Sequence, residues 1–129
     1  MTAVLDTSVV VDLDDPDVVA VLPDETAISC VTLAELHFGV LRATPKARAR
    51  RLALFARVTS LFEPLPISQD AALAWGEMAA LVRSKGANPR PRANDLWIAA
   101  TAAAENAELL TRNPGDFRHL RSLVDVRAV

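Results

Sequence analysis

Four carboxylates lie far apart in the sequence, and each falls where an element of secondary structure is expected to begin or end. They are Asp6, Glu35, Asp95 and Asp116. Hard divalent cations such as Mg2+ are bound by carboxylate oxygens that several parts of a chain contribute. Acids distributed in this way make a metal-dependent reaction the first hypothesis for the function of this protein.

Asp6 directly follows the apolar run Ala3–Leu5 and precedes Thr7 and Ser8. A lone carboxylate is costly to bury, so Asp6 must be solvated or paired. The structural alternative is an N-cap, in which the carboxylate accepts hydrogen bonds from the amides that follow it. In a functional site, the hydroxyls of Thr7 and Ser8 could orient the carboxylate or hold a water beside a metal.

The other three acids also have structural explanations. Thr32 and Glu35 have the spacing of a capping box, in which the glutamate bonds back to the amide of the cap residue. Asp95 is expected in the first turn of a helix, where an acid complements the helix dipole. Asp116 follows a turn sequence that begins at Asn113, which favours an N-cap or an Asx turn. Local sequence therefore leaves two interpretations open for each acid.

The elements that must position these acids are short strands that alternate with helices. Strands are predicted at 3–5, 26–30, 65–67, 108–111 and 123–126. One helix is predicted to begin at residue 32, and further helices are predicted over 45–62, 68–86, 94–106 and 116–120. This order predicts a single α/β domain over residues 1–129, with a mainly parallel central sheet covered by helices on both faces. Ligands of such sheets bind outside the carboxyl ends of the strands, where Asp6 is expected.

Charge is distributed unevenly although the net charge is only -2. Residues 1–40 contain eight acidic residues and no Lys or Arg, whereas residues 41–60 contain six basic residues and no acidic one. A second basic group follows at Arg83, Lys85, Arg90 and Arg92. This asymmetry suits a cation site beside a phosphate-binding surface. The alternative is that the arginine-rich helix faces are merely solvated.

Composition points to a soluble cytoplasmic protein. Cys30 is the only cysteine, so neither a disulfide framework nor a cysteine-based zinc site is expected. The sequence shows no basic leader, and no apolar stretch approaches the roughly 20 residues that span a bilayer.

In their order along the chain, four sequence blocks resemble the PIN-domain ribonucleases, and among these most closely the VapC toxins of bacterial toxin–antitoxin pairs. The blocks are Val4-Leu5-Asp6-Thr7-Ser8, Thr32-Leu33-Ala34-Glu35-Leu36, Ala93-Asn94-Asp95-Leu96-Trp97-Ile98-Ala99-Ala100-Thr101-Ala102, and Leu110-Thr111-Arg112-Asn113 with Asp116-Phe117. The third block is the most specific, and together the blocks cover essentially the whole chain. The resemblance implies a PIN-like fold.

The resemblance also implies a site and a reaction. Asp6, Glu35, Asp95 and Asp116 match the acidic quartet of the family, which holds one or two Mg2+ or Mn2+ ions, with Asp6 and Asp95 as the most regular metal ligands. Thr7 or Ser8 matches its hydroxyl position, and Asn113 a polar position near the fourth acid. The implied activity is Mg2+-dependent cleavage of RNA phosphodiesters. A VapB-like antitoxin and a homodimer are the implied protein partners.

Two other functions compete with this interpretation. A phosphatase of the haloacid dehalogenase type requires Asp-x-Asp after its first strand, but Ser8 occupies the second position here. A non-catalytic PIN-like module that binds RNA or protein need not retain four acids. The ribonuclease hypothesis makes a geometric prediction, namely that all four carboxylates meet at the carboxyl edge of the sheet, within about one metal shell.

Overall fold

A four-stranded sheet in the order β2-β1-β3-β4 forms the centre of the protein, seen here in a computed structural model that describes residues 2–129. The strands are β1 (Ala3–Leu5), β2 (Thr26–Ile28), β3 (Glu108–Thr111) and β4 (Val126–Ala128). All three strand pairs are parallel, with Val4 opposite both Ala27 and Leu109. The parallel sheet predicted from the alternating elements is thereby confirmed.

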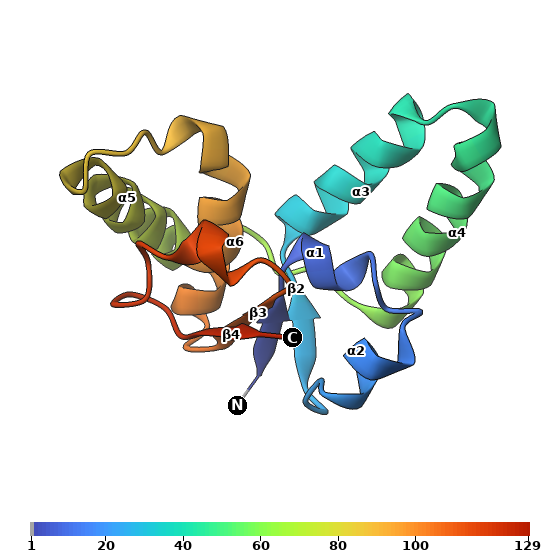
Figure 1. Ribbon diagram of the computed structural model, residues 1–129, viewed down its shortest axis with the longest axis horizontal. Helices are drawn as coiled ribbons and strands as arrows, with labels where there is room; N and C mark the ends of the chain where they lie inside the picture. Colours follow the sequence, from blue (N-terminus) through green and yellow to red (C-terminus); the bar gives the residue numbers. More distant parts are fainter. Residues whose placement is uncertain (1) are drawn as a thin grey trace.

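Helices cover both faces of this sheet (Figure 1). On one side lie α5 and α6, and on the other lie α1, α2 and the hairpin of α3 and α4, which projects away from the sheet. The helices are α1 (Thr7–Val10), α2 (Pro16–Ala20), α3 (Cys30–Arg42), α4 (Pro45–Leu61), α5 (Gln69–Ser84) and α6 (Ala93–Ala104), with short 3-10 turns η1 (Arg90–Arg92) and η2 (Pro114–Phe117).

Alternate residues of the strands supply the two halves of the core. Val4 and Leu109 point into a cluster built around α5 and α6, whereas Leu5 and Leu110 join a second cluster with α1, α3 and α4. Successive side chains of a strand point to opposite faces, so a sheet buried on both sides needs apolar residues at every position. The short apolar runs in the sequence follow from this requirement.

Several predicted boundaries are wrong. The second strand ends at Ile28 rather than at 30, and the short helix predicted over 116–120 is the 3-10 turn η2. The third helix begins at Cys30 rather than at Thr32, because Ser29 is its N-cap and its hydroxyl accepts a bond from the Val31 amide. The predicted strand at 65–67 is only a single bridge between Leu65 and Ser29. The last strand begins at Val126 rather than at 123, because the preceding turn folds buried Val124 into the core.

Two tryptophans fix the amino end of α6, which carries Asp95. The rings of Trp75 on α5 and Trp97 on α6 stack with centroids 5.2 Å apart. The Trp75 indole also donates a 3.4 Å hydrogen bond to the carbonyl of Ala93, the first residue of α6. The described part of the chain contains no helix of the length and apolar character needed to cross a membrane.

Candidate active site

Asp6 lies at the carboxyl end of β1, where its side chain is buried and held by two hydroxyls. Its Oδ2 accepts hydrogen bonds of 2.7 Å from Ser8 and 2.8 Å from Thr111. The carboxylate does not cap α1, although Asp6 occupies the N-cap position. Across residues 2–129 no hydrogen-bond donor reaches Oδ1, and no fully buried side-chain oxygen lacks a partner, so Oδ1 keeps some contact with solvent. One oxygen is thus fixed and the other is free to bind a ligand.

The hydroxyl of Thr7, the residue that follows Asp6, holds the side chain of Glu35. Thr7 Oγ1 donates to Glu35 Oε1 at 2.7 Å and shares a 2.9 Å contact with the hydroxyl of buried Thr32. The capping box predicted for Thr32 and Glu35 is wrong, because α3 begins earlier and Thr32 lies inside the helix. Glu35 therefore does not cap α3, and its carboxylate instead accepts a hydrogen bond from α1.

Asp95 and Asp116 are brought together by Arg92, a residue that sequence reasoning did not place in the site. The guanidinium Nη1 of Arg92 lies 3.3 Å from Asp95 Oδ2 and 3.1 Å from Asp116 Oδ2. Asp95 is in the first turn of α6 and Asp116 is in η2. A cation shared between two carboxylates shows that this edge of the sheet concentrates negative charge.

The pKa of Asp95 is raised above its ordinary value, first by burial and then by the negative charge of Asp6. The hydrogen bond and positive charge of Arg92 oppose this shift, and Asp116 adds a smaller upward effect. Since Asp6 and Asp116 both act on Asp95, the three carboxylates share one electrostatic environment. Acids that repel one another in this way are stabilised by a divalent cation.

The side chains of the site are of the types that bind such a cation, but their arrangement does not form a metal site. Carboxylate and hydroxyl oxygens are the ligands that Mg2+ and Mn2+ prefer. Within the described residues, however, no group of three or more His, Cys, Asp or Glu side chains is arranged to hold an ion. Pairwise contacts link the acids along one edge of the sheet, but the predicted gathering of all four within one metal shell is wrong. A metal ion shared by Asp95 and Asp116 would have to compete with the guanidinium of Arg92, which lies between them.

Thr111 also belongs to the candidate site. Thr111 ends β3, is fully buried and donates to Asp6, while its hydroxyl also accepts the amide of Asn113. The sequence signal for it was a polar residue closing an apolar strand, as Asp6 closes β1. Asn113 takes part through its backbone amide.

Comparison with known protein families matches residues 3–123 to the PIN domain. The chain belongs to the PIN-domain family. Among its relatives, the ribonuclease VapC5 of Mycobacterium tuberculosis is 40% identical over 98% of this chain and 93% of its own length. The ribonuclease VapC4 of the same species is also 40% identical, over 86% of this chain and 85% of its own.

Solved structures agree with the PIN-domain assignment. The VapBC-5 toxin–antitoxin structure from Mycobacterium tuberculosis contains a chain that is 40% identical, with a TM-score of 0.82, covering 99% of this chain and 97% of that one. A chain of VapBC2 from Rickettsia felis, solved with a DNA fragment from its promoter, is 26% identical with a TM-score of 0.83. The match covers 100% of this chain and 99% of that one. The PIN-like α/β fold expected from the sequence is confirmed.

Proposed function

We propose that this PIN-domain protein is a Mg2+-dependent endoribonuclease and the toxin of a VapBC-type pair. The observation that carries the proposal is the environment of Asp6, whose Oδ2 is fixed by two hydroxyls and whose negative charge acts on the carboxyl of Asp95. The ribonuclease names of relatives that share 40% identity support it. Mn2+ would serve in place of Mg2+ because it prefers the same oxygen ligands.

Asp6 and Asp95 are the residues that would hold the metal. A bound ion would offset the repulsion between the acids, lower the pKa of a bound water and supply positive charge for the leaving oxygen. Ser8 and Thr111 keep Asp6 from rotating, since both donate to Oδ2. Glu35, oriented through Oε1 by Thr7, can accept the proton of the attacking water at Oε2. Asp116 completes the negative field around Asp95.

The test is RNA cleavage by purified Asp6→Asn and Asp95→Asn variants. Each replacement keeps the size of the side chain and removes its charge, so the rate with Mg2+ should fall by more than about a hundred-fold. Asp17→Asn is the matched control, because Asp17 is an exposed acid on α2 and should cut like the parent. Parental rates in either site variant would show that the assignment is wrong, and an inactive parent would favour a non-catalytic module.

We also infer a VapB-like antitoxin as partner, because the similar solved structures are toxin–antitoxin complexes. Residues 1–40 carry eight acids and no Lys or Arg, which suits a basic segment of such a partner. Co-expression with the product of a small neighbouring gene, followed by purification, tests this pairing. Sedimentation of the separated chain tests the predicted homodimer.

A further inference from the structure

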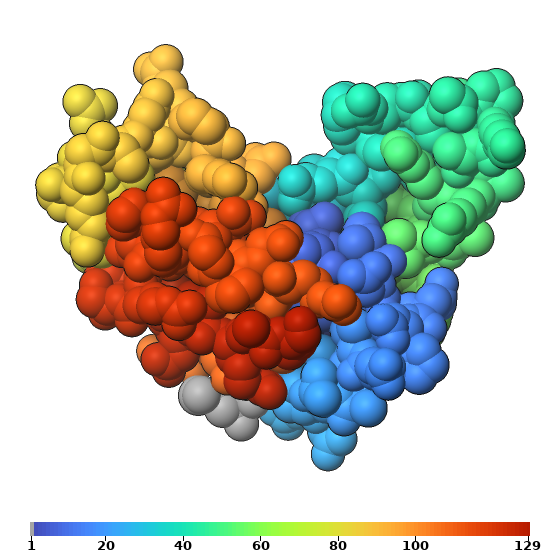
Figure 2. Space-filling model, viewed as in Figure 1, coloured from blue at the N-terminus to red at the C-terminus, as the bar shows by residue number. Residues whose placement is uncertain are grey.

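A groove of about 750 Å³ opens directly from the candidate active site. It is lined by Glu35, Phe38 and Arg42 of α3, by Arg51 of α4 and by Asn94 at the start of α6. Figure 2 shows the notch between the arm that contains α5 and α6 and the arm formed by α3 and α4. A substrate that reaches Glu35 can therefore extend into this groove.

Three side chains on one face of α3 differ in chemical type in the order of their distance from the candidate site. Glu35, Phe38 and Arg42 are separated by three and four residues, so they lie on one face of the helix and span about 10 Å. Phe38 is 62% exposed, whereas the other three phenylalanines of the chain are buried or partly buried. The guanidinium of Arg42 lies over its ring, 5.5 Å from the centroid. An acid is thus followed by an aromatic platform and then by a cation.

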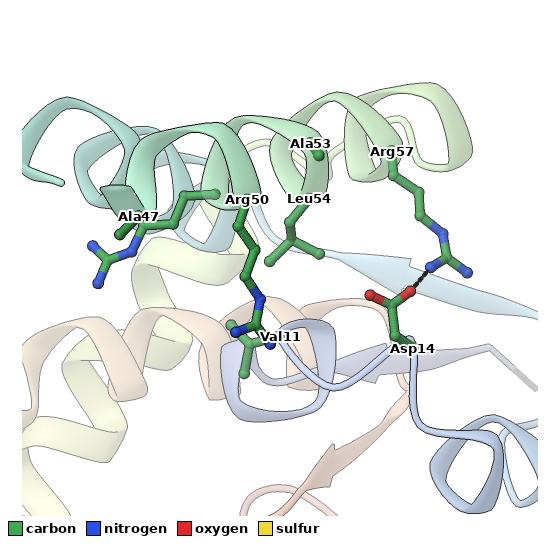
Figure 3. A pocket seen from close by; sticks show the side chains of 8 residues that line it. Val11, Asp14, Ala47, Arg50, Ala53, Leu54 and Arg57 are labelled. Atoms are coloured by element: carbon green, nitrogen blue, oxygen red, sulfur yellow. Dashed lines mark hydrogen bonds and ion pairs between the residues drawn. The ribbon is translucent and has the colours of Figure 1, made fainter. Parts of the chain in front are cut away.

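Positive charge is available along this path. In the described part of the chain, Arg42, Arg50 and Arg51 form no ion pair with a carboxylate. Arg51 donates from Nη1 to the carbonyl of Gly39 and also lines the adjoining groove between α4 and α1. Figure 3 shows Arg50 reaching over that groove toward Val11. The unpaired guanidinium groups therefore continue away from the acids along the α3–α4 hairpin.

We propose that a single-stranded segment of the RNA substrate occupies this groove, with one base stacked on Phe38 and the adjoining phosphates on Arg42 and Arg51. The inference rests on the proposed ribonuclease function and names the kind of RNA that the site accepts. An exposed aromatic ring flanked by cations is how proteins bind unpaired strands, because bases stack on the ring while phosphates meet the charges. Bases within a duplex are already stacked and cannot use the platform.

The observations favour RNA over a protein as occupant. Phe38 lies between the acidic site and free arginines, so its surroundings match a polyanion that enters a metal site. Leu41 on the same helix is 66% exposed but does not line the groove. A protein that covered the hairpin through apolar contacts would use both side chains. Substitution of Phe38 and of Leu41 therefore distinguishes RNA from a protein as the occupant of the groove.

The decisive measurement is the affinity of a short labelled single-stranded RNA, taken on the full chain carrying Asp6→Asn so that no cleavage intervenes. Phe38→Ala should weaken binding by about five- to hundred-fold, the range for losing one base stack. Phe38→Trp should retain the affinity, and Leu41→Ala is the matched control that should bind as before. Arg42→Gln should weaken binding and reduce the salt dependence by about one unit, unlike Arg83→Gln on α5.

An oligomer of the same length without bases separates stacking from charge. On this abasic strand, the parent and Phe38→Ala should bind equally, whereas Arg42→Gln should still bind less tightly. Equal loss in Phe38→Ala and Leu41→Ala, or loss of self-association or antitoxin binding with unchanged RNA affinity, would overturn the proposal. Cleavage by the protein with Asp6 intact is followed in parallel. Its absence would overturn the ribonuclease function without deciding what occupies the groove.

Discussion

Replacing Arg92 by glutamine tests whether this residue acts as a counter-ion for the acids that would bind the metal. In the structure its guanidinium neutralises part of the charge on Asp95 and Asp116. A divalent cation at the same acids must compete with it. The variant should therefore be less stable than the parent without metal and should bind metal more tightly.

The expected magnitude follows from the geometry and exposure of the two ion pairs. Their N–O distances are 3.3 and 3.1 Å, but Arg92 is 56% exposed, so solvent and salt screen both contacts. Exposed pairs contribute about 0.2–1 kcal/mol each, which gives a loss of roughly 1 kcal/mol for Arg92→Gln. In a domain of this size the melting temperature should fall by about 3–5 °C in EDTA. The same free energy corresponds to about fivefold tighter Mn2+ binding.

Thermal unfolding in EDTA and calorimetric titration with Mn2+ measure the two effects on the same samples. Arg127→Gln is the matched control, because Arg127 pairs with Glu108 at 2.9 Å, and neither residue belongs to the site. It should lose comparable stability with no change in Mn2+ affinity. Both differences should shrink at high salt. If Arg92→Gln is destabilised but binds Mn2+ no more tightly than the parent, the counter-ion role is refuted.

Three further substitutions test the way the acids are held. Thr111→Val removes one of the two hydroxyls on Asp6 and should lower both the unfolding free energy, by about 1 kcal/mol, and the rate of RNA cleavage, by about tenfold. Thr7→Val releases Glu35 and should lower the cleavage rate by about tenfold. Asp95→Asn should raise the melting temperature in EDTA at neutral pH, because the raised pKa means that the charged carboxylate destabilises the fold.

The controls for these variants come from the same chain. Thr101→Val removes a hydroxyl that bonds the Trp97 carbonyl, so it should cost stability but leave cleavage unchanged. For Asp95→Asn the pH dependence is the control. As pH rises through the raised pKa, the folded parent holds its proton longer than the unfolded chain does, so its stability falls. Asp95→Asn should be more stable than the parent only above the ordinary pKa of an aspartate. A stability difference that is the same at all pH values would contradict this reasoning.

Much of the fold could be predicted because local sequence and tertiary structure agree there. The bounds of β1 and β3 match the predicted 3–5 and 108–111, since each is a short apolar run. The positive φ of Gly86 after α5 likewise fits the helix stop expected from its sequence. The start of α3 was missed because Ser29 and Thr32 are both good caps. Only the bridge between Ser29 and Leu65, which depends on distant residues, selects the first.

The sequence predicted that Asp6 and Asp95 lie near each other, but it did not predict the contacts that hold the acids in place. Their types, order and flanking residues were sufficient to identify Asp6 and Asp95 as partners at one edge, and the pKa of Asp95 reflects that proximity. The ion pair between Arg92 and Asp116 joins residues that are far apart in the chain, and no local pattern encodes it. The same holds for the bond from Thr111 to Asp6, which crosses from β3 to β1.

The segment around Leu65, predicted as a strand, instead fixes the junction between β2 and α3. Its extended shape suggested another strand, yet Leu65 only donates to the Ile28 carbonyl and accepts the Cys30 amide. These two bonds join the end of β2 to the first residue of α3. Because a helix fixes the directions of all its side chains, this clamp also sets where Glu35 and Phe38 point. The bridge therefore helps to set the direction of the helix face that carries both Glu35 and Phe38.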